Sequence, residues 1–213
     1  MIINSIIESS AAPLLPSIYQ EVEYIQGDGT VCLNTGQKVN GINFIDITMT
    51  VDGRTVDWAS AFGVDYPSGK KIQLGYRTSD TSMSYNYGSS NTTKSIVNNV
   101  FYRFLIYNGF LEYKRLDTNA WAAAGGMTSF TGATNDFYVL AAGTNQSEGY
   151  YGISKGKVKR VIIGTSIDSV DYTYYGIPCY LKSDNTKIGI YDAIGKTFNT
   201  GSGAGVFTKG NDV

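Results

Sequence analysis

The chain has 213 residues, of which 17 are basic and 18 acidic, so its formal net charge at pH 7 is −1. Such a balance gives no strongly positive surface for nucleic-acid phosphates and argues against nucleic acid as a partner. The sequence has no histidine, which removes the commonest general base, the Ser–His and Cys–His nucleophile pairs and every His-ligated metal site.

Residues 1–18 are predicted to be an N-terminal extension. Isoleucines recur there at helical spacing, and the segment contains the sequence SSAAP. It has no Lys or Arg, so it does not fit a secretory signal. Two interpretations stay open: a docking peptide that folds on a partner or on copies of itself, and a flexible terminus. The predicted docking residues are Ile2, Ile3, Ile6 and Ile7.

Residues 19–213 are predicted to form one all-β domain. The chain has 25 glycines and 17 tyrosines but only 4 prolines, which favours strands and tight turns. Roughly a dozen or more candidate strands, with turn residues every 8 to 12 positions, are typical of a two-sheet antiparallel sandwich or barrel. No run is apolar and long enough to span a bilayer, so membrane insertion is not expected.

Two short turns predict hairpins. Gly27, Asp28 and Gly29 separate EVEYIQ from TVCLNTG, with Asp28-Gly29 as the turn pair, and Asn108 and Gly109 separate VFYRFLIY from FLEYKRL. Asn-Gly and Asp-Gly pairs supply the positive φ angles that a tight hairpin turn requires. The Asn-Gly turn is the strongest hairpin signal in the chain.

Two further segments carry local expectations. TNAWAAAGG at residues 118–126 is a helical candidate, although it is short and ended by glycines. KGKVKR at residues 155–160 alternates Lys155, Lys157 and Lys159 along one strand face, which predicts a solvated edge strand or outer sheet face.

The two ends of the domain resemble a known family. Residues 21–36, EVEYIQGDGTVCLNTG, look like an opening motif of V-E-Y-I, G-T and D/N-T-G. Residues 177–210 look like the matching closing motif, with I-P-C, then G-hydrophobic-Y-D, then G-K, an aromatic and N-x-G, then G-x-F-x-x-G. Both motifs are similar to those of concanavalin A-like, laminin-G-like jelly-roll domains of bacteriophages, prophages and gut bacterial surface proteins. The resemblance covers about residues 19–210 and is closest at the two ends.

This resemblance implies a jelly roll whose first and last strands lie near one another. Cys32 and Cys179 could then approach, but they form no CxxC pair, and two buried thiols are expected in preference to a disulfide. Members of this family often sit in tail-fibre, baseplate or head-fibre proteins, which implies a place on a virus particle.

Catalysis is not expected. Retaining glycosidases need two carboxylates about 5 Å apart on one face. Glu21 and Glu23 share a face but belong to the opening motif, and Glu112 and Asp117 are an odd number of residues apart across a turn-prone stretch. No catalytic residue is therefore predicted, and a glycosidase is kept only as a remote alternative.

No cofactor or metal is predicted either. Laminin-G-like modules sometimes hold Ca²⁺ through Asp, Asn and carbonyl oxygens, so calcium stays open. The sequence has no D-x-D-x-D-G loop, and Asp28, Asp65, Asp136 and Asp184 are interpreted as turn formers.

Glycan binding is the most specific ligand hypothesis. Sugars are held by flat aromatic rings that stack on C–H faces and by amides or carboxylates that bind hydroxyls. The predicted ligand-binding residues are Trp58, Tyr66, Tyr76, Tyr85, Asn86, Tyr87, Asn145, Tyr150 and Tyr151. The alternative for each tyrosine is an ordinary strand position with its polar tip at the surface.

The expected function is that of a non-catalytic, virion-associated protein of a bacteriophage, in capsid decoration, a head fibre or tail receptor binding. Its extension would bind other virion proteins, and its jelly roll would face outward toward host surface glycan. A trimer is expected by analogy with fibres. The alternative is a carbohydrate-binding module of a bacterial surface protein, located outside the cell or on its surface.

Overall fold

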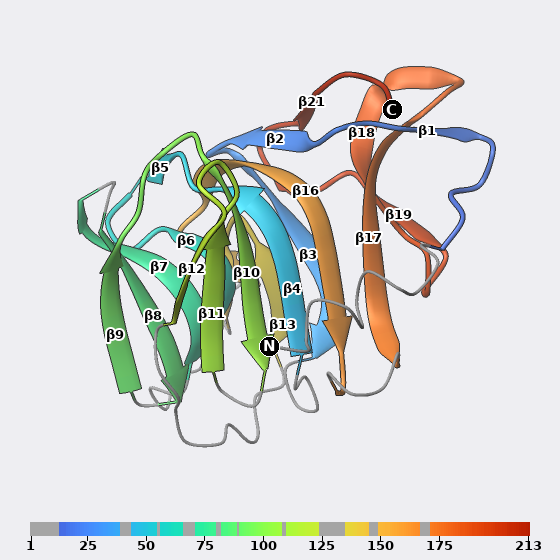
Figure 1. The fold of residues 1–213 in the computed structure, drawn as a ribbon. Helices are drawn as coiled ribbons and strands as arrows, with labels where there is room; N and C mark the ends of the chain where they lie inside the picture. Colours follow the sequence, from blue (N-terminus) through green and yellow to red (C-terminus); the bar gives the residue numbers. More distant parts are fainter. Residues whose placement is uncertain are drawn as a thin grey trace.

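The computed structural model describes residues 13–38, 44–54, 56–65, 71–79, 82–88, 90–107, 110–123, 135–144, 149–166 and 171–213. These parts of the chain form strands and turns, and none of them forms a helix. The strands build two sheets stacked in two layers (Figure 1). Nearly all neighbouring strands are antiparallel, with β14 and β6 as a parallel exception. The predicted two-sheet antiparallel β-sandwich is therefore confirmed.

The first sheet has 12 strands and runs in the order β12-β11-β10-β4-β16-β17-β18-β19, with β1 added on β17, β2 and β5 on β16, and β21 on β2. The bounds of its strands are β1 (Tyr19–Glu21), β2 (Ile25–Asp28), β4 (Phe44–Thr50), β5 (Gly53–Arg54), β10 (Phe101–Tyr107), β11 (Phe110–Arg115), β12 (Ala120–Ala123), β16 (Ser154–Gly164), β17 (Tyr172–Leu181), β18 (Asp184–Asp192), β19 (Thr197–Asn199) and β21 (Thr208–Lys209).

The second sheet has 9 strands and runs in the order β20-β3-β13-β6-β7-β8-β9, with β14 added on β6 and β15 on β14. The bounds of its strands are β3 (Val31–Lys38), β6 (Ser60–Asp65), β7 (Lys71–Ser79), β8 (Ser82–Gly88), β9 (Ser90–Ser95), β13 (Asp136–Val139), β14 (Ala142–Gly143), β15 (Tyr150–Tyr151) and β20 (Ser202–Gly203).

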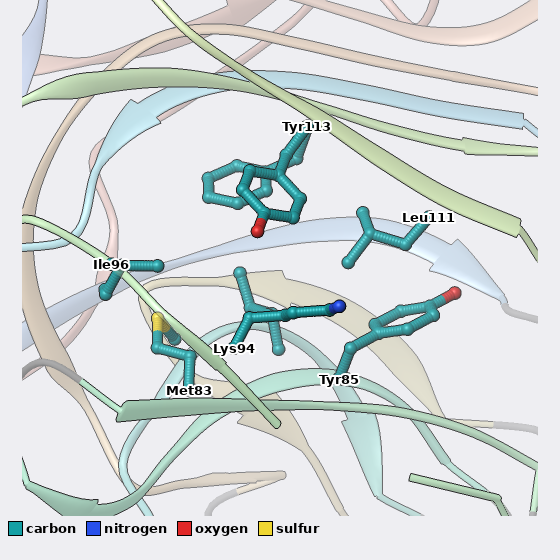
Figure 2. Close-up of a pocket in the computed structure, with 8 residues that line it drawn as sticks. Met83, Tyr85, Lys94, Ile96, Leu111 and Tyr113 are labelled. Carbon is teal, nitrogen blue, oxygen red and sulfur yellow. The ribbon is translucent and has the colours of Figure 1, made fainter. Parts of the chain in front are cut away.

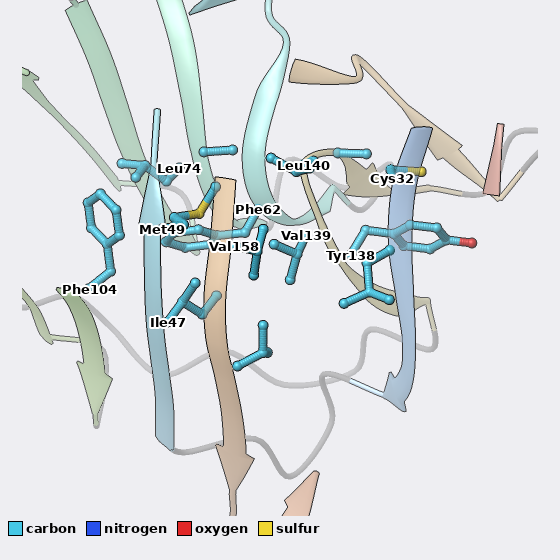
Figure 3. Packing of buried hydrophobic residues seen from close by; sticks show 14 of the residues in the cluster. Cys32, Ile47, Met49, Phe62, Leu74, Phe104, Tyr138, Val139, Leu140 and Val158 are labelled. Carbon is cyan, nitrogen blue, oxygen red and sulfur yellow. The ribbon is translucent and has the colours of Figure 1, made fainter. Parts of the chain in front are cut away.

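Alternating apolar residues fill the space between the sheets. In β4, Ile45, Ile47 and Met49 belong to the main core cluster and are at most 1% exposed. They meet apolar residues of the second sheet, as Figure 3 shows for Phe62. Phe62 packs edge-on against Phe104 of β10, with ring centroids 5.5 Å apart. This period of two places the other residues of β4 on the outer face of the first sheet.

Strands from the two ends of the domain pair with one another. Strand β2 pairs with β21, where Ile25 lies opposite Lys209, and β3 pairs with β20, where Cys32 lies opposite Ser202. Cys32 and Cys179 are nevertheless buried thiols, not partners in a disulfide. The expectation of two buried thiols is confirmed.

The Asn108-Gly109 hairpin is confirmed by register, because Tyr107 at the end of β10 pairs with Phe110 at the start of β11. The hairpin predicted at Asp28-Gly29 is wrong. Strand β2 belongs to the first sheet and β3 to the second, so the chain changes layers at this point. Asp28 still builds a tight bend, since its carboxylate accepts hydrogen bonds from the Thr30 amide and hydroxyl at 3.0 and 2.5 Å.

Two local expectations are corrected. The helical candidate at residues 118–126 contains strand β12, whose Trp121 pairs with Lys114 of β11, and this sheet pairing overrides the helix propensity of alanine. Strand β16, which carries Lys155, Lys157 and Lys159, is not an edge strand, since it pairs with both β4 and β17. The outer-face interpretation of these lysines is the correct one.

Candidate functional site

Two of the predicted sugar-stacking tyrosines lie in the core. Tyr76 is 0% exposed and Tyr85 is 1% exposed, so neither ring is open to a sugar, and both assignments are wrong. Each continues an inward-facing alternation, with Ile72 and Leu74 before Tyr76 and with Met83 before Tyr85. The Tyr76 hydroxyl accepts a hydrogen bond from the Gly53 amide at 2.8 Å, so this side chain links β7 to β5 and has a structural role.

Other predicted residues have a partial description. Asn86 is half-buried, and its side-chain amide donates to the Ser84 carbonyl at 3.4 Å. Tyr87 lies on β8 and Tyr151 on β15, but their side chains lie outside the described part of the chain. Tyr66, Asn145 and the docking residues Ile2, Ile3, Ile6 and Ile7 also lie outside the described residues.

Among the predicted residues whose side chains the structure describes, Trp58 is the exposed aromatic one. It is 58% exposed and has a φ of 65°, in the left-handed region that bulky residues rarely adopt. It lies in a turn in which the Ala59 amide donates to the Val56 carbonyl at 3.3 Å. An ion pair of 2.6 Å between Arg54 and Asp57 closes the same turn.

The structure brings this turn beside the segment that carries Tyr150 and Tyr151. The Ser60 amide donates to the Gly152 carbonyl at 2.7 Å. A Cβ placed on Gly152 would lie 3.0 Å from the Trp58 carbonyl oxygen, so the two backbones approach closely there. We call Trp58 and the Tyr150–Tyr151 strand the aromatic rim.

A tyrosine and amide cluster supports Tyr150. The Tyr150 ring packs on Tyr138, with centroids 5.6 Å apart. The Asn34 amide donates to the Tyr138 hydroxyl at 2.9 Å and to Asp136 at 3.0 Å. Burial, with a smaller contribution from Cys32, raises the pKa of Tyr138 to about 12. The phenol therefore stays neutral at physiological pH and acts as a hydrogen-bonding support.

A second candidate site is a cleft on the outer face of the first sheet. It has a volume of about 450 Å³ and mixes cationic, anionic and apolar side chains. We call it the charged cleft, and its lining residues are Glu21, Val22, Glu23, Thr48, Arg103, Leu116, Lys159, Arg160 and Val213.

A buried carboxylate fixes the cations of this cleft. Asp46 is 0% exposed and accepts hydrogen bonds from Arg103 through Nε at 3.1 Å and Nη2 at 2.9 Å. Arg160 donates to the same carboxylate through Nη2 at 2.9 Å. One carboxylate thus orients two guanidinium groups, from the strands on either side of β4. Arg103 binds it in the planar, bidentate geometry that arginine favours, whereas Arg160 makes a single contact.

A β-bulge in β16 turns two adjacent cations into the cleft. Val158 and Val161 both belong to the core cluster, although they are three residues apart. The register of β16 on β4 shifts between Val158 and Arg160, so Lys159 and Arg160 both face outward. Bulges re-aim side chains in this way, often beside functional sites.

A third concavity is an apolar crevice between the sheets, lined by Leu74, Met83, Tyr85, Lys94, Ile96, Phe104, Leu111 and Tyr113. Figure 2 shows the Lys94 amine reaching toward Tyr85 and Leu111. Its volume of about 10 Å³ is roughly what one water molecule needs. We therefore treat it as a packing gap.

The described residues contain no group of three His, Cys, Asp or Glu side chains placed to share a metal ion. Asp28 and Asp184 act as turn formers, each accepting hydrogen bonds from the threonine two residues further on. Those bonds also lower the pKa of both carboxyl groups. Asp136 instead pairs with Lys38 at 2.5 Å, and the Asp65 side chain lies outside the described residues.

No protein-family model and no curated protein matches this sequence. Among the described residues there is also no helix of the length and apolarity needed to cross a membrane.

The charged cleft was missed by sequence reasoning. One signal was present: Asp46 is a charged residue inside the strand FIDITMT, where its neighbours alternate between apolar and threonine side chains. A charge in such a strand indicates a buried partner. The identity of that partner depends on the register of β10 and β16 on β4, which local sequence patterns do not reveal.

Proposed function

We propose that this chain is a non-catalytic binding protein of a bacteriophage particle, and that the aromatic rim holds a glycan of the host surface. The proposal includes a laminin-G-like jelly-roll topology, supported by the pairing of β2 with β21 and of β3 with β20. It also includes an N-terminal extension, residues 1–18, that binds other virion proteins, and assembly as a trimer.

The conformation of Trp58 is the observation that carries the glycan proposal. An exposed tryptophan loses hydrophobic stabilisation, and a left-handed backbone costs a non-glycine residue about 1–2 kcal/mol. Trp58 combines both costs in a turn at the surface. Strained residues of this kind cluster at ligand-binding sites, where the surrounding structure holds them in place. A flat, exposed indole is well suited to stack on a sugar ring.

The non-catalytic part of the proposal rests on chemistry. Hydrolysis of a glycoside needs an acid and a nucleophile or base that face one substrate. Tyr138, beside the rim, has a pKa raised to about 12, so at neutral pH it is too weak an acid for this role and stays protonated, which prevents it from acting as a base. Release of reducing sugar from a panel of glycans would contradict this view and revive the glycosidase alternative.

Glycan binding is tested by titration calorimetry after an array screen with the whole chain. We expect Trp58→Ala to weaken binding about five-fold, since one aromatic contact contributes about 1 kcal/mol. Phe110→Ala is the matched control, because Phe110 is 48% exposed and stacks on Tyr107 of its own sheet. Equal binding by wild type, Trp58→Ala and Tyr150→Ala would remove the aromatic rim as the site.

The virion location is tested separately, by mass spectrometry of purified particles from a host that carries the gene. Absence of the chain from intact particles would contradict it. Neighbouring capsid, portal or tail genes would support the virion proposal. Neighbouring transporter or glycan-degradation genes would favour the alternative, a carbohydrate-binding module of a bacterial surface protein.

A further inference from the structure

Three adjacent strands place a row of polar residues across the floor of the charged cleft. Thr48 of β4 lies opposite Arg103 of β10 on one side and opposite Arg160 of β16 on the other. All three belong to the cleft lining. The row is part of a central, hydrogen-bonded sheet, so its geometry is rigid.

The two guanidinium groups are held before any ligand arrives. Arg103 is 8% exposed and directs Nε and Nη2 at Asp46, whereas Arg160 is 31% exposed and uses only Nη2 for that carboxylate. Arg160 therefore keeps the exposed part of its guanidinium available to a ligand while Asp46 fixes its orientation. Such preorganisation lowers the entropic cost of binding a ligand.

Lys159 adds a cation that forms no ion pair with the described residues. Its side chain is exposed, and its Nζ lies 4.4 Å from the centre of the Phe101 ring. In the described structure, neither Lys159 nor Arg160 forms an ion pair with Glu21 or Glu23, although all four line the cleft. Lys159 is therefore not neutralised by direct contact with a cleft glutamate, whereas Arg160 is paired with Asp46 below it.

The lining also supplies acceptors and apolar surface. Glu21 and Glu23 are exposed and can accept hydrogen bonds from hydroxyl groups, and Leu116, which is 41% exposed, offers apolar contact. A ligand that matches these residues carries an oxyanion, several hydroxyls and C–H surface. The cleft volume of about 450 Å³ falls within the range of small-molecule sites.

We propose that the charged cleft binds an acidic saccharide, with the sugar oxyanion on Arg160 and Lys159 and its hydroxyls on Thr48, Glu21 and Glu23. This site lies on the outer face of the first sheet, and it does not depend on glycan binding at the aromatic rim. The two proposals therefore fail independently.

The probes are oligogalacturonate, oligoguluronate and hyaluronan fragments, each compared with its carboxyl-reduced or methyl-esterified form. Titration calorimetry on the whole chain should show binding of at least one acidic form and at least ten-fold weaker binding of its neutral form, because a charge-assisted contact is lost. Binding should also weaken as NaCl is raised, through screening of the exposed cations.

Variants locate the site. Arg160→Gln and Lys159→Gln should each weaken binding about ten-fold, from the loss of one charge-assisted contact. Lys155→Gln is the matched control, since Lys155 is an exposed lysine of the same strand outside the cleft lining. Trp58→Ala should leave this binding unchanged. Unfolding midpoints of all variants show whether the fold is kept.

Three results would overturn the proposal. The first is no binding of any of the three acidic probes. The second is equal binding of the acidic and neutral forms, or an equal loss with Lys155→Gln. The third is binding of inorganic phosphate without binding of an acidic saccharide, which would reduce the cleft to a simple anion site.

Discussion

Asp46 and Arg103 meet across β4 and β10, where both oxygens of a fully buried carboxylate face the Nε and Nη2 edge of a guanidinium that is 8% exposed. Arg160 approaches the same carboxylate from β16. The pair thus lies on the outer face of the sheet, although neither member is open to solvent. Next to it on that face, Phe44, Leu105 and Ile162 form a small apolar cluster of their own. This part of the outer face is therefore packed as well, beside the open charged cleft.

Removal of the buried carboxylate should destabilise the fold. Asp46→Ala removes the buried carboxylate that pairs with Arg103 and Arg160, and breaking a buried ion pair typically costs about 3–5 kcal/mol of unfolding free energy. Urea titration followed by circular dichroism measures the loss. Asp117→Ala is the control, because Asp117 pairs with Arg115 in an exposed hairpin turn and should contribute little. An equal effect of the two substitutions would mean that Asp46 is not a structural anchor.

Replacing Trp58 should weaken glycan binding without destabilising the fold. Trp58→Gly removes the left-handed strain of a bulky residue, so we expect it to keep or raise the free energy of unfolding, by up to about 1 kcal/mol. The same substitution should abolish stacking at the aromatic rim. Thermal unfolding and calorimetry on one preparation give both quantities. A clear loss of stability would indicate that Trp58 serves the fold and would weaken the glycan proposal.

The two-sheet arrangement could be predicted from the sequence, because the alternation of apolar and polar residues along a strand indicates which side chains face the core. Ile45, Ile47 and Met49 are an example in β4. The sequence did not show which of the tyrosines are exposed enough to form a binding site. Tyr76 and Tyr85 look like surface tyrosines among polar neighbours, yet both continue inward alternations. A polar tip on a large ring leaves its burial ambiguous, and only the packing partner decides it.

Local sequence patterns also could not predict which strands pair when those strands lie far apart in the sequence. Asp28 and Gly29 have the residue types of a hairpin turn, but the same bend can pass the chain from one sheet to the other. No local sequence pattern predicts the bulge that turns Lys159 and Arg160 outward either. Both features are fixed by pairing with strands that lie far away along the chain. The resemblance at the two chain ends implied only that the entry and exit strands lie near one another, and the structure pairs β2 with β21 there.

The two thiols should be unreactive in the folded chain. Cys32 and Cys179 are buried, and burial raises the pKa of Cys179 to about 12, so the reactive thiolate is scarce near pH 8. Ellman's reagent should therefore find almost no thiol in the native protein and both thiols after unfolding in guanidinium. Intact mass should not change on reduction. Rapid labelling of the native protein, or a mass gain on reduction, would contradict this expectation.

Tyr174 should make the protein sensitive to alkali. Burial, with smaller contributions from Asp192 and Cys179, raises the pKa of its hydroxyl, and that hydroxyl has no hydrogen-bond partner among the described residues. A folded-state pKa above the unfolded value stabilises the fold fully below about pH 10, where both states keep the proton. As pH rises further, the unfolded chain ionises first, and stability falls by up to about 1.4 kcal/mol for each pH unit.

Tyr174→Phe removes this titration and loses no hydrogen bond, so its stability at neutral pH should match that of wild type within about 1 kcal/mol. Between about pH 10 and pH 11.5, urea midpoints of the variant should fall less steeply than those of wild type. Part of the slope should persist, because the pKa of Tyr138 is also raised, to about 12. If the urea midpoints of Tyr174→Phe and wild type fall equally steeply with pH, Tyr174 ionises as readily in the folded chain as in the unfolded one. Water would then reach its hydroxyl in the folded state.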